Sequence, residues 1–485
     1  MTVTASTAAP VGHPDWYLHR HLERLSNEAP LFNERLSYYE GTVRLKAILA
    51  WWKELFGTHP VGLIDNLCNV VVDVRVERMK IEGFRYTGEG ITPGELTTDA
   101  GAWRTWQWND LDEFAVDATT DAMIHGRCPV LIGPPQKDGE PAFITVESPA
   151  AVAVDYVPGT HRQVAAATKW WVDPVAQRGF ATVYLPGANY RYQTSSKITD
   201  GTLSEGASWV QGRDGQDWEQ QTGVDFVPVV EIRNPRGLSD IDPCRAGQQA
   251  LEKTFMDMLV ASEFGAVPKR VLINTLPPQD KDGNELPNWQ AEADWKKWLT
   301  LTPGPKGETP DVKQLDAAQL KNYTDAAAMQ LQHFAARHRL PAYMFSGFTG
   351  NAAVNGEGAR AAETGLISLV NLRKVAQGNG WERVVRYAAH MEGDDRRAGA
   401  DLIETVWGDS EFQTAGEQVD SLLKLAALGV PKTALWERAG ASQDEINRWK
   451  QAKPEDLVLD ANSTFGKSDP KATHVGTAGA QTTEA

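Results

Sequence analysis

Helical spacing of hydrophobic residues is clearest between residues 316 and 391. In the first half of this stretch, apolar side chains recur at steps of three or four residues: Leu320, Tyr323, Ala327, Leu331 and Phe334. Such steps place the side chains on one face of a helix. The helix must end at Leu340, because the residue before a proline is pushed out of the α conformation. The next residues, 344–357, are rich in glycine and asparagine and predict a loop.

A second long helix is predicted after this loop. Apolar side chains return to the helical period at 359–370 and again at 381–388. Residues 378–380 read Gly-Asn-Gly and separate the two runs, so they predict a break or kink in the helix. Upstream, Asp242 and Pro243 predict another helix start, because aspartate caps helix N-termini and proline suits the first helical position.

The N-terminal quarter of the chain predicts helices and one strand. Residues 16–56 have a helical and aromatic pattern, which Gly41 divides in two. Residues 63–78 are apolar on one helical face, although their β-branched side chains leave a strand open for part of the segment. Residues 79–86 predict a short strand, and residues 106–126 predict a helix.

A β-rich block occupies the middle of the chain. Short alternating or β-branched runs, separated by glycine, proline and aspartate, predict strands at 129–133, 142–147, 152–156, 161–171, 179–185, 189–193 and 227–233. Because no helical pattern lies between them, these runs predict an antiparallel sheet and not βαβ units. The polar residues 199–223 predict a long surface loop or hairpin tip.

Two smaller segments complete the pattern. A mixed insert at 268–315 begins with a predicted strand at 269–274 and ends with another at 311–315. A helical cluster is predicted at 416–452, where Gly429 ends one helix.

Composition narrows the class of protein. A net charge of −16 is unlike that of an ordinary nucleic-acid binder, although it suits a surface that only guides DNA past. The three cysteines lie far apart, which fits a reducing compartment and excludes a disulfide scaffold or a cysteine-built metal site. The 17 tryptophans suggest large apolar anchors and extensive subunit contacts. Neither a membrane span nor a signal peptide is expected, because no apolar run is long enough.

No motif defines a catalytic, cofactor or metal site. Gly356 and Gly358 outline a dinucleotide loop, but no strand precedes them. His333 and His338 lie five residues apart, so they do not share a helix face as a metal-binding pair would, and we expect surface or interface histidines. Residues 394–397 read as a solvated charged turn. We therefore expect no enzymatic activity, no cofactor and no metal ion.

Several segments resemble the portal proteins of tailed double-stranded-DNA phages, most closely those of long-tailed phages of actinobacteria. The resemblance rests on the order and spacing of YYEG at 38–41, NVVVDVRVERMKIEGFRY at 69–86, TVESPAAVAVDYVPGT at 145–160, VYLPG at 183–187, VPVVEIRNPRGLSDIDP at 227–243 and FAARHRLPAYMF at 334–345. It covers roughly residues 15–455.

The resemblance implies an α+β portal fold with a wing, a helical stem, a mixed α/β clip and a helical crown, assembled as a ring. The implied boundaries are a disordered arm at 1–14, the wing at 15–241, stem helix 1 at 242–266, the clip at 267–315, stem helix 2 at 316–339, the tunnel loop at 340–357, a long kinked helix with the wing return at 358–412, the crown at 413–458 and a disordered tail at 459–485.

The function that the resemblance implies is the passage of DNA. Such a ring, commonly of twelve subunits, occupies one capsid vertex, where terminase packages DNA through the channel and the DNA is retained and later ejected. The implied partners are further copies of the chain, double-stranded DNA bound without sequence specificity, terminase, the major capsid or scaffolding protein, and a head–tail adaptor. The chain would lie in the virion, and in the host cytoplasm during assembly.

The resemblance also implies site residues. The tunnel loop has no lysine or arginine between Leu340 and Gly358, which suits low-friction passage, and the side chains expected nearest to DNA are Phe345, Phe348, Thr349, Asn351 and Asn355. A basic belt facing the stem lumen would use Lys253, Lys313 and Lys321, although a solvated helix face explains these lysines equally well. The expected partner contacts of the clip are Trp289, Trp295 and Trp298. Two alternatives stay open, namely another ring-forming head–tail adaptor and an enzyme with an unrecognised site in the β-rich block.

Overall fold

The computed structural model describes residues 9–43, 65–87, 98–160, 162–198, 208–213, 215–266, 270–276, 282, 284, 302–303, 307, 309–314, 319–345, 356–411, 415–441 and 443–451. The chain divides into two compact units, a larger one of Met1–Gly90 and Gly101–Phe412 and a smaller one of Ile91–Ala100 and Gln413–Ala485. The described residues contain both helices and strands, as the sequence predicts. None of the helices among them has the length and apolar content needed to cross a bilayer.

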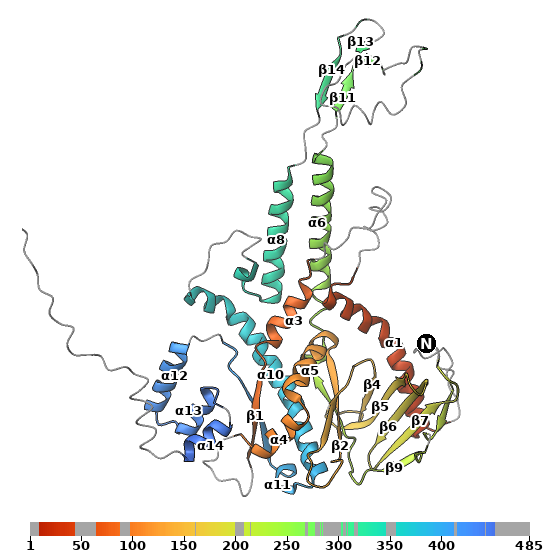
Figure 1. The fold of residues 1–485 in the computed structure, drawn as a ribbon, viewed down its shortest axis with the longest axis vertical. Coiled ribbons are helices and arrows are strands. Elements are labelled where there is room, and N and C mark those ends of the chain that lie inside the picture. Colours follow the sequence, from red (N-terminus) through yellow and green to blue (C-terminus); the bar gives the residue numbers. More distant parts are fainter. Residues whose placement is uncertain are drawn as a thin grey trace, which may run out of the picture. The chain divides into compact units, whose positions relative to one another are not determined.

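Helices of the larger unit correspond well to the helical periods of the sequence (Figure 1). They are α1 (Pro14–Glu40), α3 (Cys68–Val76), α4 (Ala100–Trp108), α5 (Leu111–His125), α6 (Arg245–Ala266), α8 (Leu320–His338), α10 (Gly356–Glu392) and α11 (Asp395–Ala398), with 3-10 turns η1 (Pro235–Gly237) and η2 (Ala342–Phe345). Helix α1 ends at Gly41 as predicted, with a left-handed φ of 70° at this residue. Because α3 is a helix from Cys68 to Val76, the strand alternative for that part is wrong.

The β-rich block forms two antiparallel sheets, where the sequence predicted one sheet region. One sheet has the order β4 (Val152–Tyr156), β5 (Val164–Asp173), β6 (Arg178–Leu185), β7 (Ala188–Thr194) and β8 (Trp209–Gln211), with β9 (Glu219–Gln221) also paired to β7. The other has the order β10 (Val229–Arg233), β2 (Arg127–Gly133) and β3 (Phe143–Val146). Part of the stretch predicted as a loop or hairpin tip thus supplies β8 and β9.

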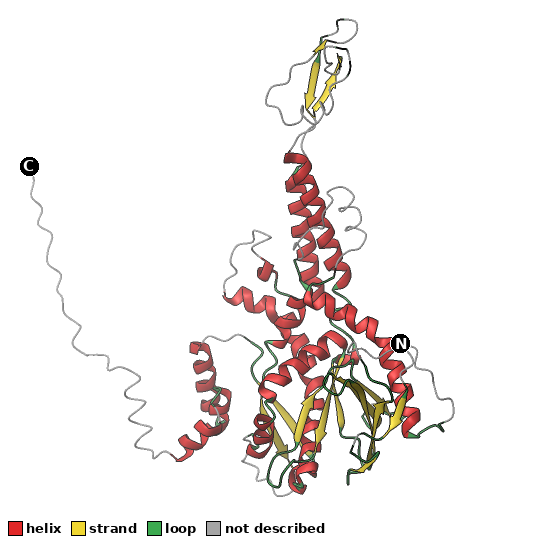
Figure 2. Ribbon diagram, turned by 45° about the vertical axis from the view of Figure 1, so that its right-hand side comes forward, coloured by secondary structure: helices red, strands yellow, loops and turns green. Residues whose placement is uncertain are grey.

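Helix α1 covers the first of these sheets. Leu18 and Leu22 on one face of α1 pack against Ala181 and Val183 of β6. The other sheet uses Leu131 and Val229 in a second core cluster with β4 and β5. Figure 2 shows the strands of these two sheets gathered together, with helices against them.

The main core lies where α3, α5, α6, α8 and α10 converge. Its fully buried side chains include Val71, Met123, Leu251, Leu331 and Leu366. Helices α6 and α8 pack side by side as they leave this core (Figures 1 and 2). The predicted stripe of apolar residues on α8 is confirmed, since Ala327, Leu331 and Phe334 are all buried.

Between α6 and α8 the described residues form two short antiparallel strand pairs. Strand β11 (Arg270–Ile273) pairs with β14 (Asp311–Gln314), and β12 (Thr275–Leu276) pairs with β13 (Thr302–Pro303). The strands predicted at both ends of the insert are therefore confirmed. Elsewhere in the unit, β1 (Ile81–Thr87) pairs with β15 (Leu402–Trp407), which joins segments on either side of the β-rich block.

The helix predicted at 106–126 is interrupted. Helix α4 ends at Trp108, and α5 begins after Asp110, which has a left-handed φ of 52°. Asn109 stabilises the break, because its side chain donates hydrogen bonds to the carbonyls of Thr105 and Ala142.

The break or kink predicted near Gly378 is not a break, since α10 runs for 37 residues without interruption. The two glycines serve packing instead. A Cβ atom on Gly380 would lie 2.8 Å from Ile232 Cδ1, and one on Gly378 would lie 3.3 Å from Trp407 Nε1. Glycine therefore lets α10 approach β10 and β15 closely.

The predicted start of α6 at Asp242 is two to three residues too early, because the helix begins at Arg245. The side chain of Asp242 pairs with Arg35 of α1 instead of capping α6. The position of Asp242 is thus set by a contact with a distant segment of the chain.

The smaller unit contains the predicted helical cluster. Its described helices are α12 (Ala415–Ala427), α13 (Lys432–Arg438) and α14 (Gln443–Gln451). Gly429 follows α12 with a φ of 86°, which confirms the predicted helix end.

Candidate functional site

The helix pair α6 and α8 is the first candidate for a channel-lining segment. Thr254 on α6 and Gln330 on α8 exchange a hydrogen bond across the pair, at 3.0 Å between Gln330 Nε2 and Thr254 Oγ1. Lys253 and Lys321 lie on exposed surfaces of the two helices. Each lysine forms an ion pair with an aspartate four residues later on the same helix, namely Asp257 and Asp325. Most of the positive charge of these lysines is therefore balanced locally.

The third lysine of the predicted belt lies elsewhere. Lys313 belongs to β14 and is paired with Val271 of β11 in the register of the strands. It is therefore not on either helix but on a strand of the insert, and its place in a lumenal belt stays a prediction.

Phe345 is the one predicted DNA-facing residue that the structure describes, and it is buried. Its side chain is 5% exposed and belongs to the main core, so in this conformation it does not reach a surface, contrary to our expectation. The other four residues of this set, Phe348, Thr349, Asn351 and Asn355, lie outside the described residues. The same is true of Trp289, Trp295 and Trp298.

A largely buried carboxylate joins the segments behind the helix pair. Asp240, in the loop before α6, accepts a hydrogen bond from Arg373 of α10, at 2.9 Å between Nε and Oδ2. Arg75 of α3 lies 3.3 Å from the same oxygen and also donates to the carbonyl of His338 at the end of α8, at 3.0 Å. One aspartate thus connects α3, α8 and α10 to the start of α6. We call Asp240, Arg75 and Arg373 the junction.

Neutral groups surround the junction. Burial, with Arg75 nearby, lowers the pKa of His338 to about 4, so its imidazole is uncharged near neutral pH. His338 Nδ1 lies 3.7 Å from the sulfur of Cys244. A hydrogen bond with Cys68, together with burial, raises the pKa of the Cys244 thiol, so this cysteine is not a reactive thiolate. The histidine is a core residue, which differs from the surface or interface histidine that we expected.

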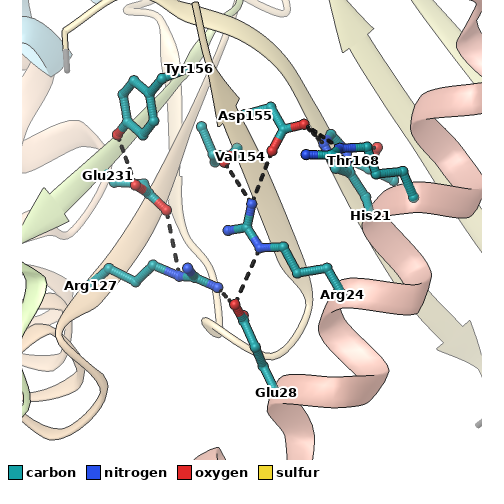
Figure 3. A network of polar contacts seen from close by, with 10 residues as sticks. His21, Arg24, Glu28, Arg127, Val154, Asp155, Tyr156, Thr168 and Glu231 are labelled. Carbon is teal, nitrogen blue, oxygen red and sulfur yellow. Dashed lines mark hydrogen bonds and ion pairs between the residues drawn. The ribbon is translucent and has the colours of Figure 1, made fainter. Parts of the chain in front are cut away.

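A second polar network ties α1 to both sheets (Figure 3). Acidic and basic side chains alternate along it, in the order Asp155, Arg24, Glu28, Arg127 and Glu231. The hydroxyl of Tyr156 donates to Glu231 at one end. At its far end His21 lies between Thr168 and Asp155, with His21 Nδ1 2.7 Å from Thr168 Oγ1 and Nε2 3.3 Å from Asp155 Oδ2. Figure 3 shows these side chains pointing toward one another from α1, β2, β4, β5 and β10.

Charge states in this network are fixed by its geometry. Hydrogen bonds from His21 and Arg20 lower the pKa of Asp155, which keeps that carboxylate charged. Burial lowers the pKa of His21, so the imidazole is neutral. Burial and the Glu231 carboxylate raise the pKa of Tyr156, so its hydroxyl remains a hydrogen-bond donor. Every carboxylate here has a donor, an arrangement suited to holding elements together.

Two observations bear on chemistry at this site. A cavity of about 400 Å³ lies beside the network, and its charged lining includes Arg24, Glu28, Arg127 and Asp155, which are already paired with one another. In the part of the chain that the structure describes, no group of three or more His, Cys, Asp or Glu residues is placed to hold a metal ion.

The charged turn after α10 is also more structural than predicted. Arg397 is buried and pairs with Asp394, at 2.7 Å between Nε and Oδ2, and with Glu392. The prediction of a solvated turn at 394–397 is therefore wrong for this arginine.

Sequence reasoning did not find the junction. Asp240 and Arg373 are separated by 133 positions. Asp240 lies in the segment 227–243 that carries the resemblance, but nothing in that segment indicates a partner for it. The sequence holds one weak indication for Arg373. It occupies a position on the buried face of α10, near Val370 and Gln377, where an apolar side chain would be expected. A charged residue on the buried face of a helix requires a partner.

Comparisons with known proteins agree with the resemblance seen in the sequence. The family model described as "Phage portal protein, SPP1 Gp6-like" matches residues 18–457. The chain is 27% identical over 459 residues to the portal protein of Mycobacterium phage D29, covering 90% of this chain and 88% of that protein. It is 28% identical over 419 residues to the portal protein of Mycobacterium phage L5, covering 82% and 81% respectively. The match to the family model spans nearly the whole described fold, and the chain belongs to the phage portal protein family.

Proposed function

We propose that copies of this chain form a ring of twelve subunits at one vertex of a phage capsid. Double-stranded DNA is packaged through its channel by terminase, retained, and later ejected. The ring also attaches to the capsid or scaffolding protein and to head–tail connector proteins. The observation that carries this proposal is the helix pair α6 and α8, which brackets the β insert and is anchored to α10 through Asp240.

The segments of the fold suit the parts of such a ring. In this proposal α6 and α8 are the stem, and the strands β11 to β14 belong to the clip that meets terminase and connector proteins. The sheets with α1, α3, α4 and α5 are the wing, residues 340–357 are the tunnel loop, and α12 to α14 are the crown. We assign the chain to the virion, with assembly in the host cytoplasm.

The electrostatics of the helix pair favour weak contact with DNA. Each phosphate that a lysine or arginine neutralises adds affinity, and tight binding would oppose sliding. Lys253 and Lys321 are both exposed, yet each has an aspartate within ion-pair distance. The chain as a whole carries a charge of −16. Such surfaces guide DNA without holding it.

End-on images of single particles of the purified full-length chain test the ring. We expect class averages with a central hole about as wide as a DNA duplex and about twelve lobes. Particles that stay monomeric or dimeric, even with capsid or scaffolding protein present, would contradict the proposal.

Arginines introduced into the tunnel loop should slow the passage of DNA. We expect the double substitution Thr349→Arg with Asn351→Arg to reduce the packaging rate at least about twofold, because the new charges contact phosphates. The defect should shrink as salt is raised, since counterion release drives these contacts. The control is Thr349→Gln with Asn351→Gln, which adds length without charge. Equal packaging rates for all three proteins would show that the loop does not meet DNA.

A further inference from the structure

The outward face of α5 combines apolar and acidic side chains. Phe114 and Val116 are 43% and 50% exposed, although both are large and apolar. Glu113 and Asp117 are exposed on the same face. Among the residues that the structure describes, no base forms an ion pair with Glu113, Asp117 or Asp121. We call these five residues the α5 face.

The negative charge of the α5 face is not balanced within the subunit. Burial, with the Asp117 carboxylate beside it, raises the pKa of Asp121 to about 6. A nearby arginine or lysine would have the opposite effect on this pKa. The face therefore offers both apolar surface and carboxylates to a basic partner.

A groove on another part of the larger unit has the opposite charge. Four arginines line a cavity of about 540 Å³, namely Arg162, Arg233, Arg383 and Arg386. The rest of the lining is Ala376, Asn379, Glu382, Asp401, Leu402 and Ile403. Arginines outnumber carboxylates four to two in this lining, and Glu382 accepts a hydrogen bond from the Thr405 amide. Leu402 at the edge is 67% exposed.

The arginines of this groove are available for a partner. Arg383 donates to the carbonyls of Asn379 and Arg162, and Arg386 donates to those of Ala398 and Ala400. No ion pair joins either arginine to a carboxylate of the described residues. Main-chain carbonyls hold the guanidinium groups in place, and because the lining has four arginines and two carboxylates, the groove keeps a net positive charge.

Apolar surface continues from the groove along α10. Leu372 and Val375 are both exposed, about three and two turns before Arg383 on the same outward side of the helix. Along the helix axis, at a rise of 1.5 Å per residue, Val375 is about 12 Å from Arg383, and on α5 Val116 is about 8 Å from Asp121. The arginine side chains are long enough to bridge the difference between these two spacings. We call the four arginines, Leu402, Leu372 and Val375 the α10 face.

We propose that the α5 face of one subunit packs against the α10 face of the neighbouring subunit in the ring. The two faces are complementary in both respects, since each presents exposed apolar side chains and the charges are opposite. A closed ring with one axis uses two different faces of each subunit, as this pairing does. This inference rests on the proposed ring and adds the surfaces that close it.

Charge reversal on the two faces tests the pairing in the full-length chain. The acidic-face variant carries Asp117→Arg and Asp121→Arg, and the basic-face variant carries Arg383→Glu and Arg386→Glu. For each variant alone, we expect the protein concentration at half-assembly, measured by sedimentation, to rise at least about tenfold, because like charges then face each other. The matched control, Asp217→Arg with Glu219→Arg, changes two exposed acids, one just before β9 and one at its start, and should assemble like the wild type.

Mixing the two variants gives the decisive result. In an alternating ring, the reversed α5 face of one variant meets the reversed α10 face of the other, and the unchanged faces meet each other. We therefore expect an equimolar mixture to assemble at a concentration within about threefold of that of the wild type. A variant that had simply misfolded could not be rescued in this way.

The remaining outcomes separate this inference from the ring itself. If the wild type forms rings and both variants do so at the same concentration, the pairing is wrong and the ring stands. If the mixture fails to assemble, the pairing is also wrong. If the basic-face variant forms normal rings but loses DNA binding, the arginines serve nucleic acid and the pairing is overturned. A wild type that forms no ring with its capsid or scaffolding protein contradicts the proposed function instead.

Discussion

Replacing Gly126 with alanine is expected to lower the free energy of unfolding by more than about 4 kcal/mol. This residue joins α5 to β2 with a φ of 92°, a conformation that costs an L side chain about 1–2 kcal/mol. The new Cβ atom would also lie 2.3 Å from the carbonyl oxygen of Gly237 and 2.8 Å from its carbonyl carbon. Because both atoms belong to the main chain, the clash can be relieved only by moving η1 away from α5. Urea unfolding followed by tryptophan fluorescence measures the loss.

A second glycine isolates the contribution of the clash. Gly139 has a φ of 82°, and a Cβ atom added there would meet nothing within 4 Å. Gly139→Ala should therefore cost only about 1–2 kcal/mol, the amount expected from backbone conformation alone. Equal losses for the two variants would mean that η1 yields easily and that the close approach at Gly126 is unimportant.

Removing the carboxylate of Asp240 is expected to cost about 3–5 kcal/mol. Arg75 is 3% exposed and Arg373 is also buried, so Asp240→Asn leaves two guanidinium groups in the core without a counter-ion. Burial already lowers the pKa of Arg75, which reflects the cost of keeping this charge away from water. Thermal or urea unfolding of the full-length chain measures the effect.

The matched control removes an ion pair on the surface. Lys253 and Asp257 lie four residues apart on α6, with more than 40% of each side chain exposed. Lys253→Ala with Asp257→Ala should change the free energy of unfolding by less than about 0.5 kcal/mol. If Asp240→Asn were as mild as this control, the junction would not contribute to the cohesion of the four segments.

Elements with a one-sided core face could be predicted from the sequence. The stripe from Ala327 to Phe334 predicted α8, and the alternating runs predicted the strands of both sheets except β8 and β9. In each case the pattern is local, because burial on one side repeats with the period of the element itself. The resemblance to portal proteins added the family, which no single motif identified.

Breaks and continuities along helices could not be predicted in this way. The apolar period runs through Asp110 although the chain turns there, since α4 and α5 both bury their in-phase residues. In α10 the opposite holds, because Gly378 and Gly380 look like helix breakers but are required for close packing. Whether a glycine breaks a helix or lets a neighbour approach depends on a partner far away in the sequence.

Contacts between distant charges were beyond prediction for a similar reason. Asp240, Arg75 and Arg373 look like surface residues in a sequence, and no spacing rule connects them. The same limit applies to Phe345. The glycine and asparagine residues after it predicted an exposed loop, but the phenyl side chain of Phe345 lies in the main core. In both cases the position of the side chain depends on segments that are distant in the sequence and meet only in the folded protein.

Helix α10 is held near its middle, at Arg373. Its 37 residues span about 55 Å, and Arg373, which Asp240 holds, divides that length into arms of about 26 and 28 Å. A rigid rod held near its middle moves both ends by similar amounts in opposite directions. A tilt of about 5° around the Arg373 contact would displace each end by about 2 Å, given these lengths. A force applied at Gly356 would therefore move Glu392 only if β10 and β15 moved with it, because Gly378 and Gly380 hold the C-terminal arm close to these strands.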